Sequence, residues 1–139
     1  MNPRATKPPV RVLIVDSSRI QRAGLALTLG SQPDFEVVGQ ASDGTRALAR
    51  VRQEQIDVVL MDIQLPKLDG IAATEKIRTD KRVLAHGPAP RVILLTALDV
   101  DAFLPSAAVA GAFAVLFKDT EPESLFATVR DAAGAREPA

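Results

Sequence analysis

Four polar residues, each at the end of a short apolar run, are the side chains best suited to chemistry in this sequence: Asp16, Asp62, Thr96 and Lys118. Two neighbouring carboxylates repel each other, which favours either a bound divalent cation or a raised pKa on one of them, and oxygen ligands without His or Cys suit Mg²⁺. A carboxylate beside a lysine and a hydroxyl is also suited to accepting a phosphoryl group, because lysine neutralises phosphoryl oxygens and the hydroxyl donates a hydrogen bond. The pattern predicts Asp62 as the nucleophile.

The elements that must position these residues are five apolar strands that alternate with five helices. The strands are expected at residues 11–15, 35–41, 57–61, 91–95 and 113–117. Alternation of this kind is typical of an α/β fold, a parallel sheet with helices on both faces, and favours the flavodoxin-like strand order 2-1-3-4-5. In that order strands 1 and 3 are neighbours, so Asp16 and Asp62 are expected side by side at the carboxyl edge of the sheet.

The first three helices are expected at about residues 18–31, 45–54 and 70–78. Ser17 or Ser18 is expected to cap the first of them, which would have its inner face formed by residues at helical spacing. Those residues are Ile20, Ala23 and Leu27.

The last part of the chain is harder to assign. Residues 79–90 are expected to be a polar loop, longer than most such connections. Pro105 would remove a hydrogen bond from a helix interior, so the next helix is expected to start near Leu104 or to be distorted. The segment Thr120–Glu123 has the pattern of a capping box with proline in the first turn, and its helix is expected to end near Gly134.

The composition is that of one soluble domain. The 139 residues carry 17 basic and 17 acidic side chains, so a general attraction to nucleic acid or anionic membranes is not predicted. The absence of cysteine excludes disulfides and thiolate metal sites, and no apolar run approaches the ~20 residues of a membrane span. We expect a cytoplasmic protein with a disordered lead-in at residues 1–9, a folded domain at 10–133, and a tail or linker start at 134–139.

Four motifs in chain order resemble the receiver domain of two-component response regulators. They are Val12–Asp16, Leu60–Gly70, Ile93–Ala97 and Leu116–Asp119. Within that superfamily, the segments Arg22–Leu25 and Phe35–Gly39 and the pair Lys118–Asp119 resemble the NarL/FixJ group. The similarity covers about residues 10–133.

The resemblance implies a regulatory domain that is not an enzyme beyond phosphoryl transfer to its own Asp62, with a histidine kinase as the usual donor. The acidic pocket that holds Mg²⁺ is implied to be made by Asp16, Asp62 and the backbone of Gln64. The positions implied for phosphate binding and switching are Thr96, Ala97 and Lys118.

Three residues depart from the family's pattern along one signalling route. Ser17 stands where the family has a second acidic residue, which is the direct metal ligand, and a neutral hydroxyl is a poor substitute for a carboxylate at Mg²⁺. Val115 stands where the family has an aromatic switch residue, and a valine has no large ring to swing between two sites. Pro105 falls in the neighbouring helix. We therefore expect weak Mg²⁺ binding and slow or absent phosphorylation.

Two hypotheses for function remain open. In the first, the chain is a switch operated by Mg²⁺-dependent phosphorylation of Asp62. In the second, which we favour for the mechanism, it is a degenerate receiver that works without phosphorylation as a dimerisation, ligand-binding or partner-binding module. A flavodoxin-like cofactor binder is disfavoured because no Gly-rich phosphate loop follows the first strand.

The same residues also have structural interpretations that involve no chemistry. Asp16, Ser17 and Ser18 are all residue types that cap helices, and Asp69 is expected to be a cap rather than a ligand. The resemblance further implies a C-terminal helix-turn-helix domain beyond Ala139, through which the full-length protein would bind DNA. We expect an excised receiver that forms a homodimer, through either the first and last helices or the fourth helix and fifth strand.

Overall fold

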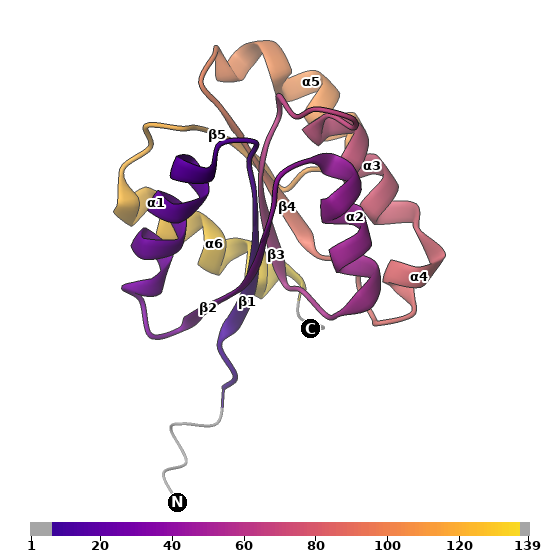
Figure 1. Cartoon of the computed structure of the whole chain (residues 1–139), viewed down its shortest axis with the longest axis horizontal. Coiled ribbons are helices and arrows are strands. Elements are labelled where there is room, and N and C mark those ends of the chain that lie inside the picture. The colour runs from indigo at the N-terminus through magenta and orange to yellow at the C-terminus, as the bar shows by residue number, and fades with distance from the viewer. Residues whose placement is uncertain (1–6, 137–139) are drawn as a thin grey trace, which may run out of the picture.

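The computed structural model describes residues 7–136, which form a five-stranded parallel sheet between two layers of helices (Figure 1). The strands are β1 (Val10–Val15), β2 (Phe35–Ala41), β3 (Val58–Asp62), β4 (Arg91–Thr96) and β5 (Ala114–Phe117). They lie in the order β2-β1-β3-β4-β5, and every neighbouring pair is parallel. The predicted fold class and strand order are confirmed.

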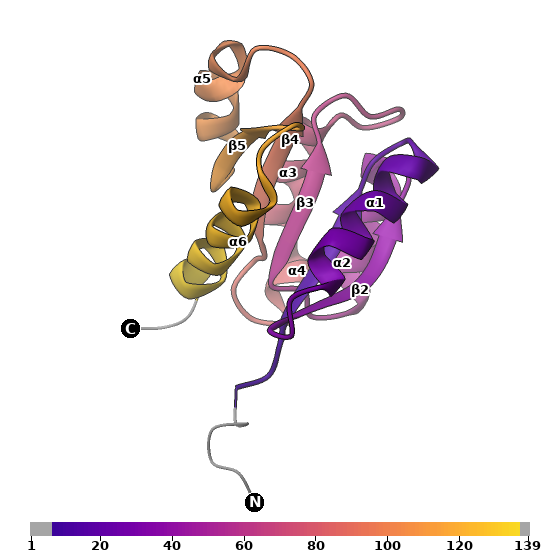
Figure 2. The same ribbon diagram turned by 90° about the vertical axis from the view of Figure 1, so that its left-hand side faces the viewer.

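Helices cover both faces of the sheet (Figures 1 and 2). They are α1 (Arg19–Gly30), α2 (Gly44–Gln53), α3 (Gly70–Thr79), α4 (Lys81–Leu84), α5 (Val100–Ala110) and α6 (Pro122–Arg136). Helices α1 and α6 pack on one face, and α2 to α5 pack on the other. Within the described residues, no helix is both long enough and apolar enough to cross a bilayer.

The core consists of two clusters separated by the sheet. Successive strand residues point to opposite faces, so Val12 and Ile14 of β1 join the α1/α6 cluster while Leu13 and Val15 join the other. Both faces of the central strands are therefore apolar, which explains why their sequences are continuous hydrophobic runs rather than alternating ones. Polar side chains gather where these buried strands end.

The prediction of which face of α1 is buried is wrong. Ile20 is 84% exposed, Leu27 is 79% exposed and Ala23 is also exposed, whereas Leu29 is buried and Leu25 is partly buried. Apolar residues recur at helical spacing on both sides of this helix, and spacing alone does not say which stripe faces inward. The cap at the start of the helix fixes its rotation and turns the Leu25–Leu29 side toward the sheet.

The helix that contains Pro105 also differs from the prediction. It begins at Val100, after Asp99 whose side chain accepts a hydrogen bond from the amide of Asp101, and it continues through Pro105 to Ala110. Proline removes the amide that would bond to the carbonyl four residues earlier. Pro105 and Asp101, whose carbonyl loses this bond, are both exposed, so the carbonyl is on a side of the helix that water can reach and the proline is tolerated.

Two further boundaries differ. The region predicted as a loop at residues 79–90 contains the short helix α4, capped by the Asp80 side chain, and Val83 of this helix is buried in the core. Helix α6 begins at Pro122, so the predicted capping residue Thr120 lies one position too early, and it continues past Gly134 to Arg136. The predicted lead-in at residues 1–9 lies mostly outside the described residues, as do residues 137–139 of the predicted tail.

Candidate functional site

The structure brings Asp16, Asp62 and Lys118 together at the carboxyl edge of the sheet. The Lys118 ammonium lies 2.9 Å from Asp16 Oδ2 and 3.0 Å from Asp62 Oδ2, close enough to donate a hydrogen bond to each carboxylate. Asp16 is 2% exposed and Asp62 is 7% exposed. Asp16 follows β1, Asp62 ends β3 and Lys118 follows β5. The parallel sheet brings the carboxyl ends of these strands to one edge, so residues far apart in sequence become neighbours.

Asp62 is held by the strand that it ends and by the turn that follows. Every residue of β3 is buried, and the amide of Ile63 donates to the carbonyl of Leu95 at 3.0 Å, which extends the pairing with β4 by one bond. The amide of Gln64 donates to Asp62 Oδ1 at 3.2 Å. One carboxylate oxygen of Asp62 therefore faces a backbone amide and the other faces Lys118. The proposed use of the Gln64 carbonyl as a metal ligand stays a prediction.

Gly70 makes this turn possible because the chain returns very close to Asp62. Its amide donates to the carbonyl of Ile63 at 2.8 Å, and a Cβ at this position would overlap the carbonyl oxygen of Asp62 and lie 2.9 Å from the Cα of Ile63. Real side-chain carbon atoms do not approach backbone atoms this closely, so glycine is required by space. The Asp-Gly pair that ends the second sequence motif thus combines the α3 cap, Asp69, with this close approach.

We expect Gly70→Ala to lower the free energy of unfolding by about 1–3 kcal/mol or more, because overpacking against backbone atoms forces a shift. Gly24→Ala is the matched control. A Cβ there meets nothing within 4 Å, and Gly24 lies inside α1, so alanine should stabilise the chain by about 0.5–1 kcal/mol. Urea unfolding of both variants measures the two effects. If Gly70→Ala were as stable as Gly24→Ala, the β3–α3 turn would have to adapt freely to a side chain.

Asp16 is positioned by the turn between β1 and α1. The amide of Ser18 donates to Asp16 Oδ1 at 2.8 Å, while the Ser18 hydroxyl caps α1 by accepting from the amide of Gln21 at 3.2 Å. Ser17 is exposed at this turn, whereas Asp16 is buried and Ser18 is partly buried. The prediction that a serine caps this helix is confirmed for Ser18.

One contact of Asp16 was not foreseen from the sequence. The Arg22 guanidinium donates from Nη1 to the Asp16 carbonyl at 2.7 Å and from Nε to Gln40 Oε1 at 3.3 Å. Arg22 therefore joins α1 to the ends of β1 and β2. The available sequence signal was an arginine four residues after the capping serine, which about one helical turn brings back over the start of the helix.

Thr96 ends β4, Ala97 follows it, and Val115 lies on β5. Thr96 is 1% exposed, its hydroxyl accepts from the amide of Leu98 at 3.0 Å, and its carbonyl accepts from the amide of Lys118 at 2.8 Å. Ala97 is exposed in the bend after β4. Val115 is buried in the core cluster under α5. The backbone thus connects the Thr96 position directly to the Lys118 position.

The charge of Lys118 is stabilised by its two partners. Burial by itself would lower the pKa of this amine, but the hydrogen bonds and charges of Asp16 and Asp62 outweigh it, and the pKa of Lys118 is raised above its usual value. Lys118 is therefore an ammonium ion throughout the physiological range. With two carboxylates and one ammonium, the formal charge of the group is −1.

The oxygen ligands of this group suit a hard cation, but there are few of them. Mg²⁺ takes oxygen ligands, commonly one or two carboxylates, with water completing the shell. Asp16 and Asp62 supply two carboxylates, but no group of three or more His, Cys, Asp or Glu side chains within residues 7–136 is arranged to hold a metal. Ser17, at the position where the resemblance expects an acid, is neutral and exposed. The residues fit Mg²⁺ as a weak site.

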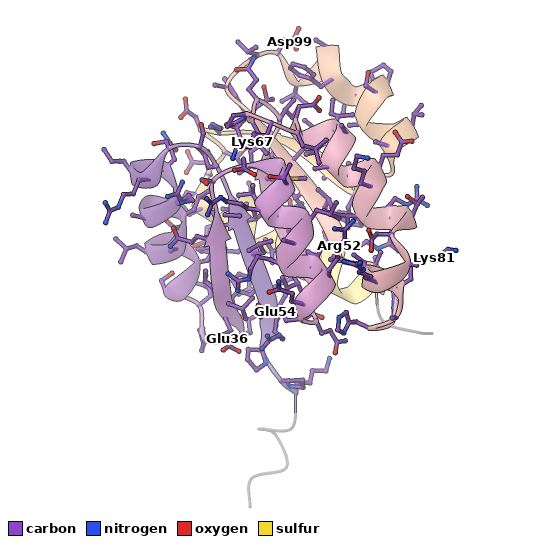
Figure 3. The ribbon with its side chains drawn as sticks, turned by 45° about the vertical axis from the view of Figure 1, so that its right-hand side comes forward. Glu36, Arg52, Glu54, Lys67, Lys81 and Asp99 are labelled. Atoms are coloured by element: carbon purple, nitrogen blue, oxygen red, sulfur yellow. The ribbon has the colours of Figure 1, made fainter. Side chains whose placement is uncertain are left out.

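A second buried acid on the same edge has a structural role. Asp43 is 3% exposed and caps α2, accepting hydrogen bonds from the amide of Arg46 and from the Thr45 hydroxyl. These bonds lower the pKa of Asp43, the Thr45 bond most strongly. Lys67 approaches the same carboxylate at 3.9 Å from the β3–α3 turn, at the end of the molecule where the strands finish (Figure 3). Asp43 is therefore a helix cap, with Lys67 as a distant and exposed ion partner.

Comparison with known proteins assigns this architecture to a family. Residues 12–130 match the model of the response regulator receiver domain. The nitrate/nitrite response regulator NarP of Escherichia coli is 34% identical over 134 residues, which are 96% of this chain and 58% of NarP. A protein-glutamate methylesterase/protein-glutamine glutaminase of Anaeromyxobacter dehalogenans is 41% identical over 117 residues, which are 83% of this chain and 32% of that protein.

Solved structures agree with these sequence matches. The signal receiver domain of the putative response regulator NarL from Mycobacterium tuberculosis superposes with a TM-score of 0.83 at 30% identity, covering 94% of this chain and 100% of that domain. The chain spans about half the length of the curated transcriptional regulators it matches. On these grounds the chain belongs to the response regulator receiver domain family of two-component systems, and it is of the NarL/FixJ-like kind.

Proposed function

We propose that this receiver domain regulates its protein without depending on phosphorylation of Asp62, because its acidic pocket binds Mg²⁺ too weakly at physiological concentrations. The family is regulatory, and the chain carries the residues of a phosphoacceptor site. The proposal concerns how that site is used. It makes the domain a module for dimerisation or for binding a ligand or partner protein, with the pocket held together by the shared Lys118 ammonium.

The observation that carries the proposal is the exposure of a neutral Ser17 beside a pocket with two carboxylates. Asp16, Asp62 and the Gln64 carbonyl are the groups that would hold Mg²⁺, whose chemistry would be to neutralise the oxygens of an incoming phosphoryl group. With one carboxylate fewer than the family's pattern, the pocket has less negative charge to attract the cation. The Lys118 ammonium already neutralises one of the two remaining carboxylate charges. Cation affinity should fall accordingly.

The experiment that tests this proposal is phosphorylation of the purified chain by acetyl phosphate at millimolar Mg²⁺, followed by intact-mass measurement. We expect no appreciable mass increase, and no spectral change with beryllofluoride, which mimics the phosphoryl group. A receiver with three acidic pocket residues serves as the positive control. Full conversion to the phosphorylated mass under the same conditions would contradict the proposal.

A second candidate, a phosphorylation-operated switch, is favoured by the intact neighbourhood of Asp62. One oxygen of Asp62 would attack the phosphorus of the donor, the bond from phosphorus to the leaving group would break, and acetate would leave when acetyl phosphate is the donor. Lys118 is within hydrogen-bond distance of the attacking carboxylate, and Thr96 ends the adjacent strand. Labelling of Asp62 that is already complete at millimolar Mg²⁺ would favour this candidate over the first.

The rest of the proposal concerns the whole protein. We propose that the domain comes from a cytoplasmic, DNA-binding transcription regulator, in which a helix-turn-helix domain would contact DNA and a histidine kinase would be the partner if phosphorylation occurs. A homodimer would use one of two exposed apolar faces. The first includes Ile20 and Leu27 of α1, and the second includes Leu104 and Val109 of α5.

A further inference from the structure

Arg22 lies outside the pocket and contacts the backbone of Asp16. Its guanidinium donates to the Asp16 carbonyl at 2.7 Å and to Gln40 Oε1 at 3.3 Å, and its own amide donates to the Ser18 carbonyl at 3.0 Å within the first turn of α1. The side chain is partly buried. It therefore bridges over the whole turn from Asp16 to Ser18.

The turn beneath Arg22 decides where the Asp16 carboxylate points. Asp16 Oδ1 accepts from the Ser18 amide at 2.8 Å, which leaves Oδ2 to face the Lys118 ammonium at 2.9 Å. On the other side, the Asp16 amide donates to the Ala41 carbonyl at 3.1 Å. With the carbonyl bound to Arg22, both backbone polar groups of Asp16 and both carboxylate oxygens have a partner. Removing the Arg22 side chain removes the hydrogen bond to the Asp16 carbonyl and leaves the other three in place.

We propose that Arg22 is a positioning residue for the acidic pocket: it holds the Asp16 carboxylate in the orientation that faces Lys118 and a bound cation. The inference rests on the proposed function only in its metal-binding consequence. In a pocket with two carboxylates instead of three, each must be well placed, so the support of Asp16 has more effect here than it would with a third acid present. Partners that orient a ligand from outside the metal shell commonly change metal affinity by about 10–100-fold.

Charge and position predict opposite results, which makes the inference testable. Arg22 carries a positive charge near the pocket, so if only its charge mattered, Arg22→Ala would tighten cation binding. If Arg22 positions Asp16, Arg22→Ala weakens binding. Arg22→Lys keeps the charge but loses the planar fork that reaches two acceptors at once, so positioning predicts a smaller weakening and charge alone predicts no change.

The experiment is a Mg²⁺ titration followed by amide resonances of Ser18 and Gln64, in the wild-type chain and in the Ser17→Asp background where binding is stronger. We expect Arg22→Ala to weaken binding by about tenfold and Arg22→Lys by less. Arg19→Ala is the matched control, since Arg19 is an exposed arginine on the same helix for which the structure shows no side-chain hydrogen bond within residues 7–136. It should leave binding unchanged or slightly tighter. Unchanged or tighter binding in Arg22→Ala would overturn the inference.

A second measurement needs no metal. If neither the wild type nor Ser17→Asp binds Mg²⁺, our explanation of the Ser17 position is wrong, but the role of Arg22 can still be tested. Hydrogen exchange of the Ser18 amide reports its bond to the Asp16 carboxylate. We expect exchange about tenfold faster in Arg22→Ala, a loss of roughly 1.4 kcal/mol, with core amides of β1 and β3 unchanged. The Arg19→Ala control should exchange as the wild type does. Equal Ser18 exchange in the wild type and Arg22→Ala would overturn the inference by itself.

Discussion

Replacing Lys118 by methionine is expected to lower the free energy of unfolding at pH 7 by roughly 1–3 kcal/mol. The variant leaves Asp16 and Asp62 as neighbouring buried carboxylates with no ammonium between them. Removing one partner of a fully buried ion pair costs about 3–5 kcal/mol. The smaller figure applies here because the Lys118 side chain is 21% exposed and water screens part of the repulsion.

The pH dependence of the Lys118 contribution has a definite sign. In the wild type, burial would lower the pKa of Lys118, but its hydrogen bonds and charge interactions with Asp16 and Asp62 outweigh burial and raise that pKa, so its stabilising contribution is fully present at neutral pH. That contribution is lost only as the pH rises above the usual pKa of lysine and through the raised folded-state pKa.

Chemical denaturation of Lys118→Met and the wild type at pH 7 measures this prediction. Lys67→Met is the matched control, because the Lys67 side chain is 63% exposed and lies 3.9 Å from Asp43, so its removal should cost less than about 0.5 kcal/mol. An unfolding free energy that is the same for wild type and Lys118→Met at pH 7 would mean that the lysine is not the counter-charge of the pocket.

Replacing Ser17 by aspartate is expected to make the chain a substrate for acetyl phosphate at millimolar Mg²⁺. The new carboxylate follows Asp16 directly in an exposed turn, so it brings a third acid to the pocket edge without disturbing the core. A third anionic oxygen is the ligand type that Mg²⁺ prefers. We expect phosphorylation to rise at least tenfold in rate, with all incorporated phosphate on Asp62.

Two controls accompany the Ser17→Asp variant. Ser17→Asn introduces a side chain of nearly the same size and shape as aspartate but with a neutral amide, so this variant should behave as the wild type does. The double variant Ser17→Asp, Asp62→Asn retains the new acid but lacks the acceptor, so it should take up no phosphate. If Ser17→Asn is phosphorylated as fast as Ser17→Asp, the shape of the turn and not its charge limits the reaction.

The sheet and its strand order were predictable because they depend on local patterns. The apolar runs that become β1, β3 and β4 are buried on both faces, and a parallel sheet of five such units has few arrangements. The same argument predicted that Asp16 and Asp62 would meet. Lys118 could be placed with them because it follows a strand at the edge of the same sheet.

The predictions that were wrong concern choices that the local sequence does not decide. Ile20 and Leu27 have the spacing of a buried stripe, but the opposite stripe of α1 has it too, and only the cap and the tertiary contacts select between them. Pro105 is unfavourable in a helix interior, yet it lies on the exposed side of the helix, where water can reach the carbonyl that loses its bond. The Arg22 contact depends on the side-chain direction of a residue that the sequence presents only as one more helix cation.

The most direct test of the account is the Mg²⁺ affinity of the wild-type pocket relative to Ser17→Asp, measured by titration of the Ser18 and Gln64 amide resonances. We expect the wild-type pocket to bind Mg²⁺ at least tenfold more weakly than Ser17→Asp, a difference of about 1.4 kcal/mol, and to be mostly unoccupied at millimolar Mg²⁺. Saturation of the wild type at millimolar Mg²⁺, with an affinity equal to that of Ser17→Asp, would contradict it.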